Sequence, residues 1–328
     1  MTRVLVTGVT GQDGTLLARR LRAAGDEVHG VSLTGDAPPT WTDADTAGVT
    51  VHIGDVADGA RVAEVIAQVE PDEIYHLAGQ TSVAASWDDP VGTLRSTGLG
   101  AVFVFEAAHR LQDRTGRPVR VVQTSSAEMF GQAEQTPQDE DTPIRPVSPY
   151  GVAKAMAHQM AGIYRSRGLF VATCILYNHE SPLRPPTFVT RKITAAAARI
   201  AVDGGGTLAM GNLDASRDWG WAPDYVDAMV RAARHDAPED FIVATGRTHT
   251  VEDFVRIAFA SAGINDWRPH IKVDRRFVRP VDAAVQIGNA GKAEAVLGWR
   301  AATTFEEIVR RMVEHDLELM RNGTPEAS

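Results

Sequence analysis

Tyr150 and Lys154 are four positions apart, and on a helix this spacing brings both side chains onto one face. An ammonium beside a phenol favours the phenolate, so we expect Tyr150 to act as a general base near neutral pH, although the reference pKa of tyrosine is about 10. The alternative is a surface tyrosine beside a solvated lysine. Catalysis is favoured because a strand-like run ends at Ser125-Ser-Ala-Glu-Met-Phe-Gly131, where Ser126 can hydrogen-bond the same substrate hydroxyl.

Three glycines lie between the first strand-like run and the first helical pattern. We expect them to form a tight turn, to let the backbone approach a dinucleotide pyrophosphate at the helix N-terminus, and to pack the helix closely on the strand. A glycine-rich turn without a ligand is the alternative. The predicted cofactor contacts on this turn and on later strand ends are Gly8, Thr10, Gly11, Gln12, Asp13, Gly14, Ser32, Asp55, Val56, Leu77, Ala78, Gly79, Gln80 and Ser82.

The second strand-like run ends in Ser32-Leu-Thr34, which is the region that contacts the adenosine ribose in such folds. An acidic residue there favours NAD and an arginine favours NADP, and this segment has neither. Asp36 lies a few residues late and can equally be a solvated loop residue. The prediction is therefore NAD(P), with the choice left open.

Glu128 follows Ser126 by two positions, where a simple alcohol dehydrogenase needs no carboxylate. Oxidation of a sugar C4 hydroxyl to a ketone acidifies the C5 proton, which a nearby carboxylate can remove. The C6 hydroxyl can then leave as water, and hydride can return to C6, so that the net reaction is a dehydration. The other interpretation is that Glu128 orients a substrate hydroxyl or a loop amide.

Seven runs rich in β-branched residues alternate with helical patterns, and this predicts a doubly wound, Rossmann-type parallel sheet of class α/β. The predicted strands are Arg3–Val6, Glu27–Leu33, Val49–Ile53, Glu73–Leu77, Val119–Thr124, Val171–Tyr177 and Phe241–Ala244.

After Tyr177 the pattern becomes irregular, which predicts a smaller substrate-binding lobe. We assign residues 1–178 to the dinucleotide-binding domain, with 220–248 returning to it, and residues 179–219 and 249–328 to the lobe. Thr304-Phe-Glu-Glu307 reads as a capping box that begins a final amphipathic helix.

The composition excludes several classes of protein. The formal charge of -9 and the pI of about 5.6 argue against a nucleic-acid-binding face. No apolar run is long enough to span a membrane, and a strand that starts at Arg3 leaves no room for a signal peptide, so we expect a cytoplasmic protein. The single cysteine, Cys174, lies in an apolar run and reads as core; we expect no metal site.

Several motifs resemble the extended short-chain dehydrogenases that act on nucleotide sugars, and most closely the GDP-mannose 4,6-dehydratase family. They are Gly11-Gln-Asp-Gly14, Ser148-Pro-Tyr-Gly151, Asn178-His-Glu-Ser-Pro182 with Arg184, Phe188-Val-Thr-Arg-Lys-Ile193, Gly211-Asn-Leu-Asp214, Arg217-Asp-Trp-Gly220, Asp224-Tyr-Val226 and Leu297-Gly-Trp299.

The resemblance implies a dehydratase that uses NADP and takes GDP-mannose. It implies catalysis by Ser126, Glu128, Tyr150 and Lys154, with the last two also at the cofactor. It places His179 and Arg184 near the cofactor. The implied substrate contacts are Ser82, Ser126, Asn178, Val189, Lys192, Arg217 and Arg279. The three cations in that set suit a diphosphate, although each alone can be a surface charge.

Departures from the family pattern keep alternatives open. Ser32-Leu-Thr34 replaces paired arginines that hold the 2′-phosphate and help to build a tetramer, so NAD is not excluded and we expect a homodimer, with tetramer assembly open. Ala127 replaces a polar residue, which leaves the acid for the leaving hydroxyl unassigned. Trp221 and Val281-Asp282 differ from the usual residues near the substrate, so a heptose or another GDP-hexose can replace mannose. The rival functions are a GDP-4-keto-6-deoxymannose reductase, a 4-epimerase and a non-catalytic nucleotide-binding protein.

Overall fold

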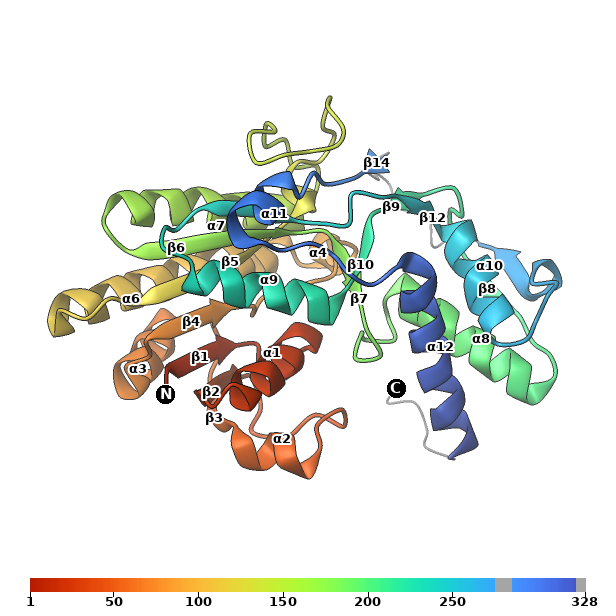
Figure 1. Ribbon diagram of the computed structural model, residues 1–328, viewed down its shortest axis with the longest axis horizontal. Coiled ribbons are helices and arrows are strands. Elements are labelled where there is room, and N and C mark those ends of the chain that lie inside the picture. Colours follow the sequence, from red (N-terminus) through yellow and green to blue (C-terminus); the bar gives the residue numbers. More distant parts are fainter. Residues whose placement is uncertain (275–284, 323–328) are drawn as a thin grey trace.

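A computed structural model describes residues 1–274 and 285–322, and its centre is a sheet of seven parallel strands (Figure 1). The strand order is β11-β6-β5-β4-β1-β2-β3, so the direction of winding reverses between β1 and β4. All seven predicted strands are confirmed, with small shifts at their ends. The bounds are β1 Arg3–Thr7, β2 Glu27–Ser32, β3 Thr50–Ile53, β4 Glu73–His76, β5 Arg120–Ser126, β6 Phe170–Leu176 and β11 Asp240–Val243.

Helices cover both faces of this sheet. Alternating side chains of one strand serve the two faces: Val4 and Val6 of β1 pack in one apolar core, and Leu5 packs in the other. The first core is closed by α1 (Gln12–Ala23) and α9 (Ala222–Arg234). The second is closed by α3 (Gly59–Val69), α6 (Gly100–Thr115) and α7 (Pro149–Ser166).

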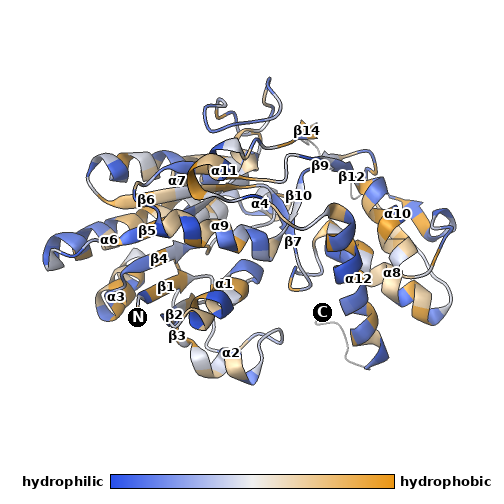
Figure 2. Ribbon diagram, in the orientation of Figure 1, coloured by the Kyte–Doolittle hydropathy of each residue, from blue (hydrophilic) through white to orange (hydrophobic). Residues whose placement is uncertain are grey.

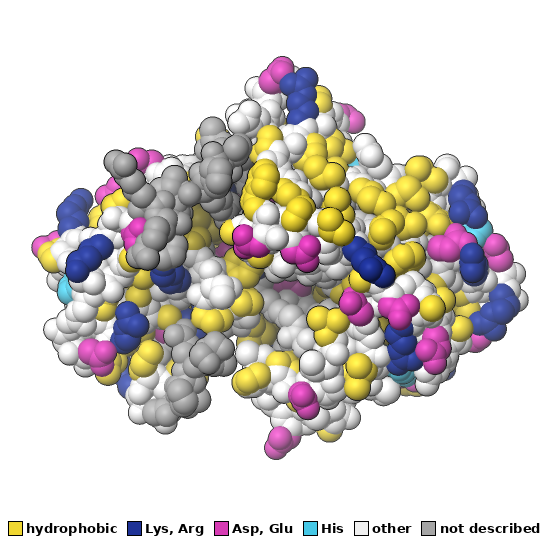
Figure 3. Space-filling view, turned by 180° about the vertical axis from the view of Figure 1, so that it is seen from behind, with side chains coloured by type: hydrophobic (Ala, Val, Ile, Leu, Met, Phe, Trp, Pro, Cys, Tyr) yellow, Lys and Arg dark blue, Asp and Glu magenta, His cyan; other side chains and the backbone are white. Residues whose placement is uncertain are grey.

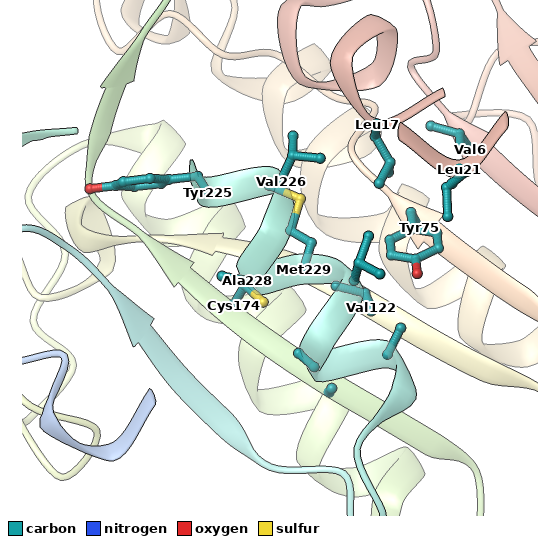
Figure 4. Close-up of a cluster of buried hydrophobic side chains, with 14 of the residues drawn as sticks. Val6, Leu17, Leu21, Tyr75, Val122, Cys174, Tyr225, Val226, Ala228 and Met229 are labelled. Carbon is teal, nitrogen blue, oxygen red and sulfur yellow. The ribbon is translucent and has the colours of Figure 1, made fainter. Parts of the chain in front are cut away.

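Cys174 lies in the first core, beside Ala228 of α9 (Figure 4). Its side chain is fully buried, and burial raises the pKa of the thiol to about 12. The prediction that Cys174 is a core residue is therefore confirmed, because a protonated, inaccessible thiol is a poor nucleophile.

A third apolar core joins α8 (Val189–Asp203), α10 (Val251–Ser261) and α12 (Phe305–Arg321), and we call these three helices the helical lobe (Figure 1). Figure 2 shows that α12 carries an apolar stripe along an otherwise polar helix. Arg191 of α8 forms a buried ion pair with Asp316 of α12. The lobe is built from separated stretches of chain, and its division from the sheet domain stays a prediction.

Short elements complete the chain. The small sheets pair β10 (Trp219–Trp221) with β7 (Asn178–Glu180), β13 (Ile271–Val273) with β8 (Leu208–Met210), and β12 (His249–Thr250) and β14 (Val285–Gln286) with β9 (Ser216–Arg217). The short helices are α2 (Asp43–Gly48), α4 (Ala85–Asp88), α5 (Pro90–Thr93), η1 (Leu94–Leu99), η2 (Ala127–Met129), η3 (Arg268–His270) and α11 (Gly291–Leu297). No helix in the described part of the chain is long and apolar enough to cross a bilayer.

The predicted capping box of α12 is half correct. The Thr304 hydroxyl accepts a hydrogen bond from the Glu307 amide at 3.3 Å, as an N-cap should. The Glu307 carboxylate, however, pairs with Arg310 and Arg311 on the next turn. Two guanidinium groups outcompete one backbone amide for that carboxylate.

Candidate active site

The predicted catalytic residues meet where β5 ends and α7 begins. Ser148 caps α7 by accepting the Gly151 amide, and Pro149 occupies the first turn, so Tyr150 enters the helix immediately. A Cβ at Gly151 would lie 2.6 Å from the Glu128 carbonyl oxygen, so glycine is needed for α7 to approach η2 this closely. On that turn the Ser126 hydroxyl accepts the Glu128 amide at 3.3 Å.

Tyr150 and Lys154 are both buried, and the Lys154 ammonium lies 5.7 Å from the centroid of the Tyr150 ring. Lys154 donates a hydrogen bond to the Thr124 carbonyl oxygen at 2.8 Å. The predicted pairing on one helix face is therefore present. Glu128 is partly exposed on η2, and its charge acts on Tyr150.

The predicted lowering of the phenol pKa is wrong for this arrangement. Burial raises the pKa of Tyr150 to about 12, and it outweighs the hydrogen bond with Ser126, which acts in the opposite direction. Burial also lowers the pKa of Lys154 to about 8. The ammonium is thus harder to keep charged than the sequence suggested, and desolvation is the largest influence on the pKa of the phenol.

The glycine turn has the geometry that a pyrophosphate requires. Gly8 has a φ of 72°, and a Cβ there would lie 3.0 Å from the Ala78 backbone. A Cβ at Gly14 would lie 2.2 Å from the Gly8 carbonyl oxygen, so the third glycine lets α1 pack on the turn. Gly11 caps α1 without a side-chain hydrogen bond. First-turn amides at such a helix N-terminus suit an anion, so these residues fit a dinucleotide.

The end of β4 forms the next wall of this site. The Thr7 hydroxyl accepts the amides of Leu77 and Ala78, both at 3.2 Å, and faces His76 Nδ1 at 2.8 Å. Because the Thr7 oxygen already accepts two amides, the hydroxyl donates its one proton to His76. Burial lowers the pKa of His76 to about 3, so the ring is neutral and can accept it. Thr7 therefore links the ends of β1 and β4 at the switch point.

The loop after β4 is held by its own side chains. The backbone amide of Gln80 donates to the Thr97 hydroxyl at 3.0 Å. The side-chain oxygen of Gln80 accepts hydrogen bonds from the backbone amides of Thr81 and Ser82. Gly79, at a φ of 148°, leaves room for Thr97. Gly79 and Gln80 thus shape this loop, and their contact with a cofactor stays a prediction.

At the other end of the turn, the Ser32 hydroxyl lies 3.3 Å from the Thr10 hydroxyl. One carboxylate oxygen of Asp55 accepts a hydrogen bond from the Ala57 amide at 2.8 Å. Asp55 and Val56 also line a small, mainly apolar cavity between β1, β2 and α3, which has room for no more than about one water molecule, so an adenine ring would have to lie outside it.

His179 and Arg184 lie on the far side of the glycine turn. His179, on β7, contacts Asp13 of α1 at 2.8 Å, and Ser181 donates to the side-chain oxygen of Gln12 at 2.9 Å. Arg184 pairs with Glu180 at 3.4 Å. Charges of Asp13 and Arg184 both reach Tyr150, so the structure brings the predicted cofactor and catalytic residues together.

The predicted substrate residues are spread over the helical lobe and its connections. Asn178 lies on β7, and Val189 is exposed at the start of α8. Lys192 donates to the Ala209 carbonyl oxygen at 2.8 Å, and Arg217, buried on β9, donates to that of Ser216. Arg279 and Val281-Asp282 lie outside the described residues, and the role of all these residues stays a prediction.

Ser86 is a positioning residue that the sequence analysis missed. Its fully buried hydroxyl accepts the Tyr150 amide at 3.3 Å and donates to the Val83 carbonyl oxygen at 2.7 Å. The hydroxyl thereby satisfies an amide that the start of α7 leaves unpaired. Only its place near the N-terminus of a catalytic helix could have identified it, and that requires the tertiary structure.

Comparison with known proteins agrees with this geometry. Residues 5–312 match the family model described as GDP-mannose 4,6 dehydratase. GDP-mannose 4,6 dehydratase 1 of Arabidopsis thaliana is 40% identical over 327 residues, which cover 97% of this chain and 90% of that protein. The GDP-mannose 4,6 dehydratase of Homo sapiens is 36% identical over 345 residues, with 97% and 92% coverage. The UDP-glucose 4-epimerase of Thermus thermophilus, solved with NAD, aligns with a TM-score of 0.82 at 25% identity, covering 96% and 98% of the two chains.

Proposed function

The chain belongs to the GDP-mannose 4,6-dehydratase family and is a nucleotide-sugar dehydratase that uses a nicotinamide dinucleotide, and we propose that its substrate is GDP-mannose. The choice of GDP-mannose is supported by the family match, and the elimination is supported by Glu128, which lies on η2 beside Ser126 and is close enough for its charge to act on Tyr150. A carboxylate there can serve an elimination as well as an oxidation.

In this mechanism Tyr150 takes the proton of the C4 hydroxyl, and Ser126 hydrogen-bonds that hydroxyl. Because burial raises the pKa of Tyr150 to about 12, the proposal requires that the Lys154 ammonium and the bound cofactor offset this burial in the working enzyme. When bound, the nicotinamide supplies the acceptor for the C4 hydride and returns a hydride to C6. Glu128 takes the C5 proton, and the C6 hydroxyl leaves. Two protons are taken, by Tyr150 and Glu128. Two are needed, one to convert the leaving hydroxide to water and one to restore C5, so the reaction balances without an outside reductant.

Substrate binding is proposed for the region where β7, β9 and the start of α8 lie, between the sheet and the helical lobe. Lys192 and Arg217 would meet the diphosphate, because cations stabilise it, and Asn178 would meet the sugar end from β7. Ser82, Val189 and Arg279 complete the proposed contacts.

The decisive experiment is the mass of the product from GDP-mannose. We expect a product lighter by one water with no reduced cofactor added. Net consumption of reduced cofactor with a keto-sugar, and no loss of water from GDP-mannose, would identify a reductase instead. A panel of GDP-, UDP- and TDP-sugars tests whether mannose is the preferred sugar.

We also propose that the dinucleotide is NAD. Residues 31–36 contain no lysine or arginine, and a 2′-phosphate needs such a cation. The nearby Arg61 is occupied, since it donates to the Ile53 carbonyl oxygen at 2.8 Å and pairs with Glu64 at 2.7 Å. Mass analysis of the cofactor released from denatured protein tests this proposal, and NADP as the main species would contradict it.

A homodimer through α7 and the adjoining helices is proposed as the assembly. Exposed apolar side chains occur on α5, η1 and α7, at Val91, Leu99, Val152 and Ile163, and α7 packs directly against η1 and α5. Figure 3, which shows the molecule from behind, has apolar side chains gathered over part of that face. We expect Val152→Lys to give monomers in light scattering. Val202→Lys, at an exposed apolar site on α8, is the control that should stay dimeric; a wild-type monomer or tetramer would contradict the proposal.

A further inference from the structure

His179 lies with both ring nitrogens against hydrogen-bond acceptors. Nδ1 lies 2.7 Å from the Tyr177 carbonyl oxygen, and Nε2 lies 2.8 Å from Asp13 Oδ2. A neutral imidazole carries one N–H and can satisfy only one of these acceptors. We infer that His179 is an imidazolium held by Asp13, and that it neutralises the acidic residue in the turn that receives the cofactor pyrophosphate. The second part rests on the proposed use of a dinucleotide.

The surroundings of His179 fix its orientation. Its ring stacks on Tyr225 of α9 with centroids 4.7 Å apart and planes 25° apart, a contact that favours a cation over a neutral ring. Gln12 donates both to Asp13 Oδ1, at 3.1 Å, and to the His179 carbonyl oxygen, at 3.2 Å. The donors and acceptors of Gln12, Asp13 and His179 thus point at one another, which leaves little freedom for the ring to turn.

The charged groups around the pair favour the ion pair over a shared proton. Burial is the largest influence on His179 and lowers its pKa, but the charge and hydrogen bond of Asp13, with the Tyr177 carbonyl, leave that pKa raised even though Arg184 opposes this. Burial is also the largest influence on Asp13 and raises its pKa, but His179, Gln12 and Arg184 together leave that pKa lowered. Asp13 also acts on Lys154 and Tyr150 of α7. The alternative is a protonated Asp13 that donates to a neutral histidine. It would require a raised pKa at Asp13 and a lowered pKa at His179, which is the opposite of both shifts.

The pair explains why an aspartate is tolerated in this turn. Asp13 is the second residue of α1, where a carboxylate interacts favourably with the helix dipole but repels a pyrophosphate bound at the same N-terminus. The imidazolium cancels that charge without occupying the free amides of the turn. His179 acts here as a positioning and charge-balancing residue for the cofactor turn.

The protonation state can be measured directly by nitrogen NMR of the imidazole in the cofactor-free and cofactor-bound full chain. Because the pKa of His179 is raised, we expect both of its ring nitrogens to stay protonated above the ordinary histidine pKa of about 6.5. In the Asp13→Asn variant, one ring nitrogen of His179 should lose its proton already below neutral pH. A single unprotonated nitrogen at pH 7 in the wild-type protein would overturn the inference.

A double-mutant cycle on cofactor affinity tests the charge balance, with binding followed by calorimetry independently of turnover. His179→Gln leaves Asp13 unpaired and should weaken binding about tenfold. The double variant Asp13→Asn with His179→Gln should recover to within about threefold of the wild type. Asp113→Asn, which removes an exposed charge on α6, is the control and should change nothing.

Failure of the charge balance and failure of the proposed function give different results. A double variant as weak as His179→Gln alone refutes the charge balance, because then the histidine matters for another reason. A wild-type protein that binds no nicotinamide dinucleotide refutes the proposed function, while the NMR result on His179 and Asp13 still decides the ion pair. If the variants do not fold, the wild-type nitrogen spectrum remains the test.

Discussion

Lys154→Met is the substitution whose effect can be worked out most fully from the structure. Lys154 is buried, and burial lowers the pKa of its ammonium from 10.5 to about 8. Methionine has a similar length and no charge, so the variant removes the ionisable group with little loss of packing. We expect it to lose catalytic activity and, in the same pH range, to gain stability relative to the wild type.

The sign follows from proton linkage. Because the folded pKa lies below the unfolded one, the stabilising contribution of Lys154 is complete only above pH 10.5 and is lost as the pH falls through about 8. The depressed pKa of Lys154 lowers the free energy of unfolding by about 3 kcal/mol at pH 7 and by about 1 kcal/mol at about pH 9.5. The stability advantage of the variant should therefore shrink by about 2 kcal/mol over that range.

Urea unfolding of the cofactor-stripped proteins at several pH values measures this difference. Constant terms, such as the lost hydrogen bond to the Thr124 carbonyl oxygen, cancel because only the change with pH is read. Lys272→Met is the matched control, since Lys272 is exposed on β13 and its difference from the wild type should be flat. A difference for Lys154→Met that does not vary with pH, or that grows with pH, refutes the assignment of a desolvated ammonium.

Three further outcomes test other parts of the structure. Glu128→Gln should keep the cofactor and lower kcat by about 10²-fold or more, with oxidised sugar accumulating in place of product. Unchanged turnover would show that Glu128 only orients a substrate hydroxyl or a loop amide. Gly14→Ala should cost about 2 kcal/mol in urea unfolding, because its Cβ would lie 2.2 Å from a backbone oxygen, whereas Gly162→Ala, with no atom closer than 3.8 Å, should be neutral or stabilising. Asp316→Asn should lower the free energy of unfolding by about 3 kcal/mol by leaving Arg191 charged and buried, and a loss near zero would show that water reaches the pair.

The sheet could be predicted from sequence because each strand is marked locally. β6, for example, is a continuous apolar run, as a strand buried on both faces must be. The strand order is not local information, since it depends on which crossovers the helices permit. The cap of α12 shows the same limit at small scale: the spacing predicted both hydrogen bonds, and the competing Arg310 and Arg311 were already in the sequence but could not be ranked.

The candidate site was predictable as a set of residues and not as an electrostatic environment. The spacing of Tyr150 and Lys154 indicates that they share a helix face, but it says nothing of how deeply both are buried. Burial reverses the direction of the phenol pKa. The partnership of Asp13 and His179 was also missed, because no local pattern connects residues so far apart in the chain.

That separation of 166 residues has a consequence for how the protein is made. The glycine turn leaves the ribosome early, while β6, β7 and the histidine that balances the turn follow only after half of the chain. Parallel strands and other non-local pairings form slowly, since the entropy of a long loop is lost before its contacts are gained. The nascent turn therefore carries an uncompensated negative charge until β7 arrives. We therefore expect capture of the dinucleotide to be a late event in folding, so that the early chain lacks the stabilisation that a bound ligand confers.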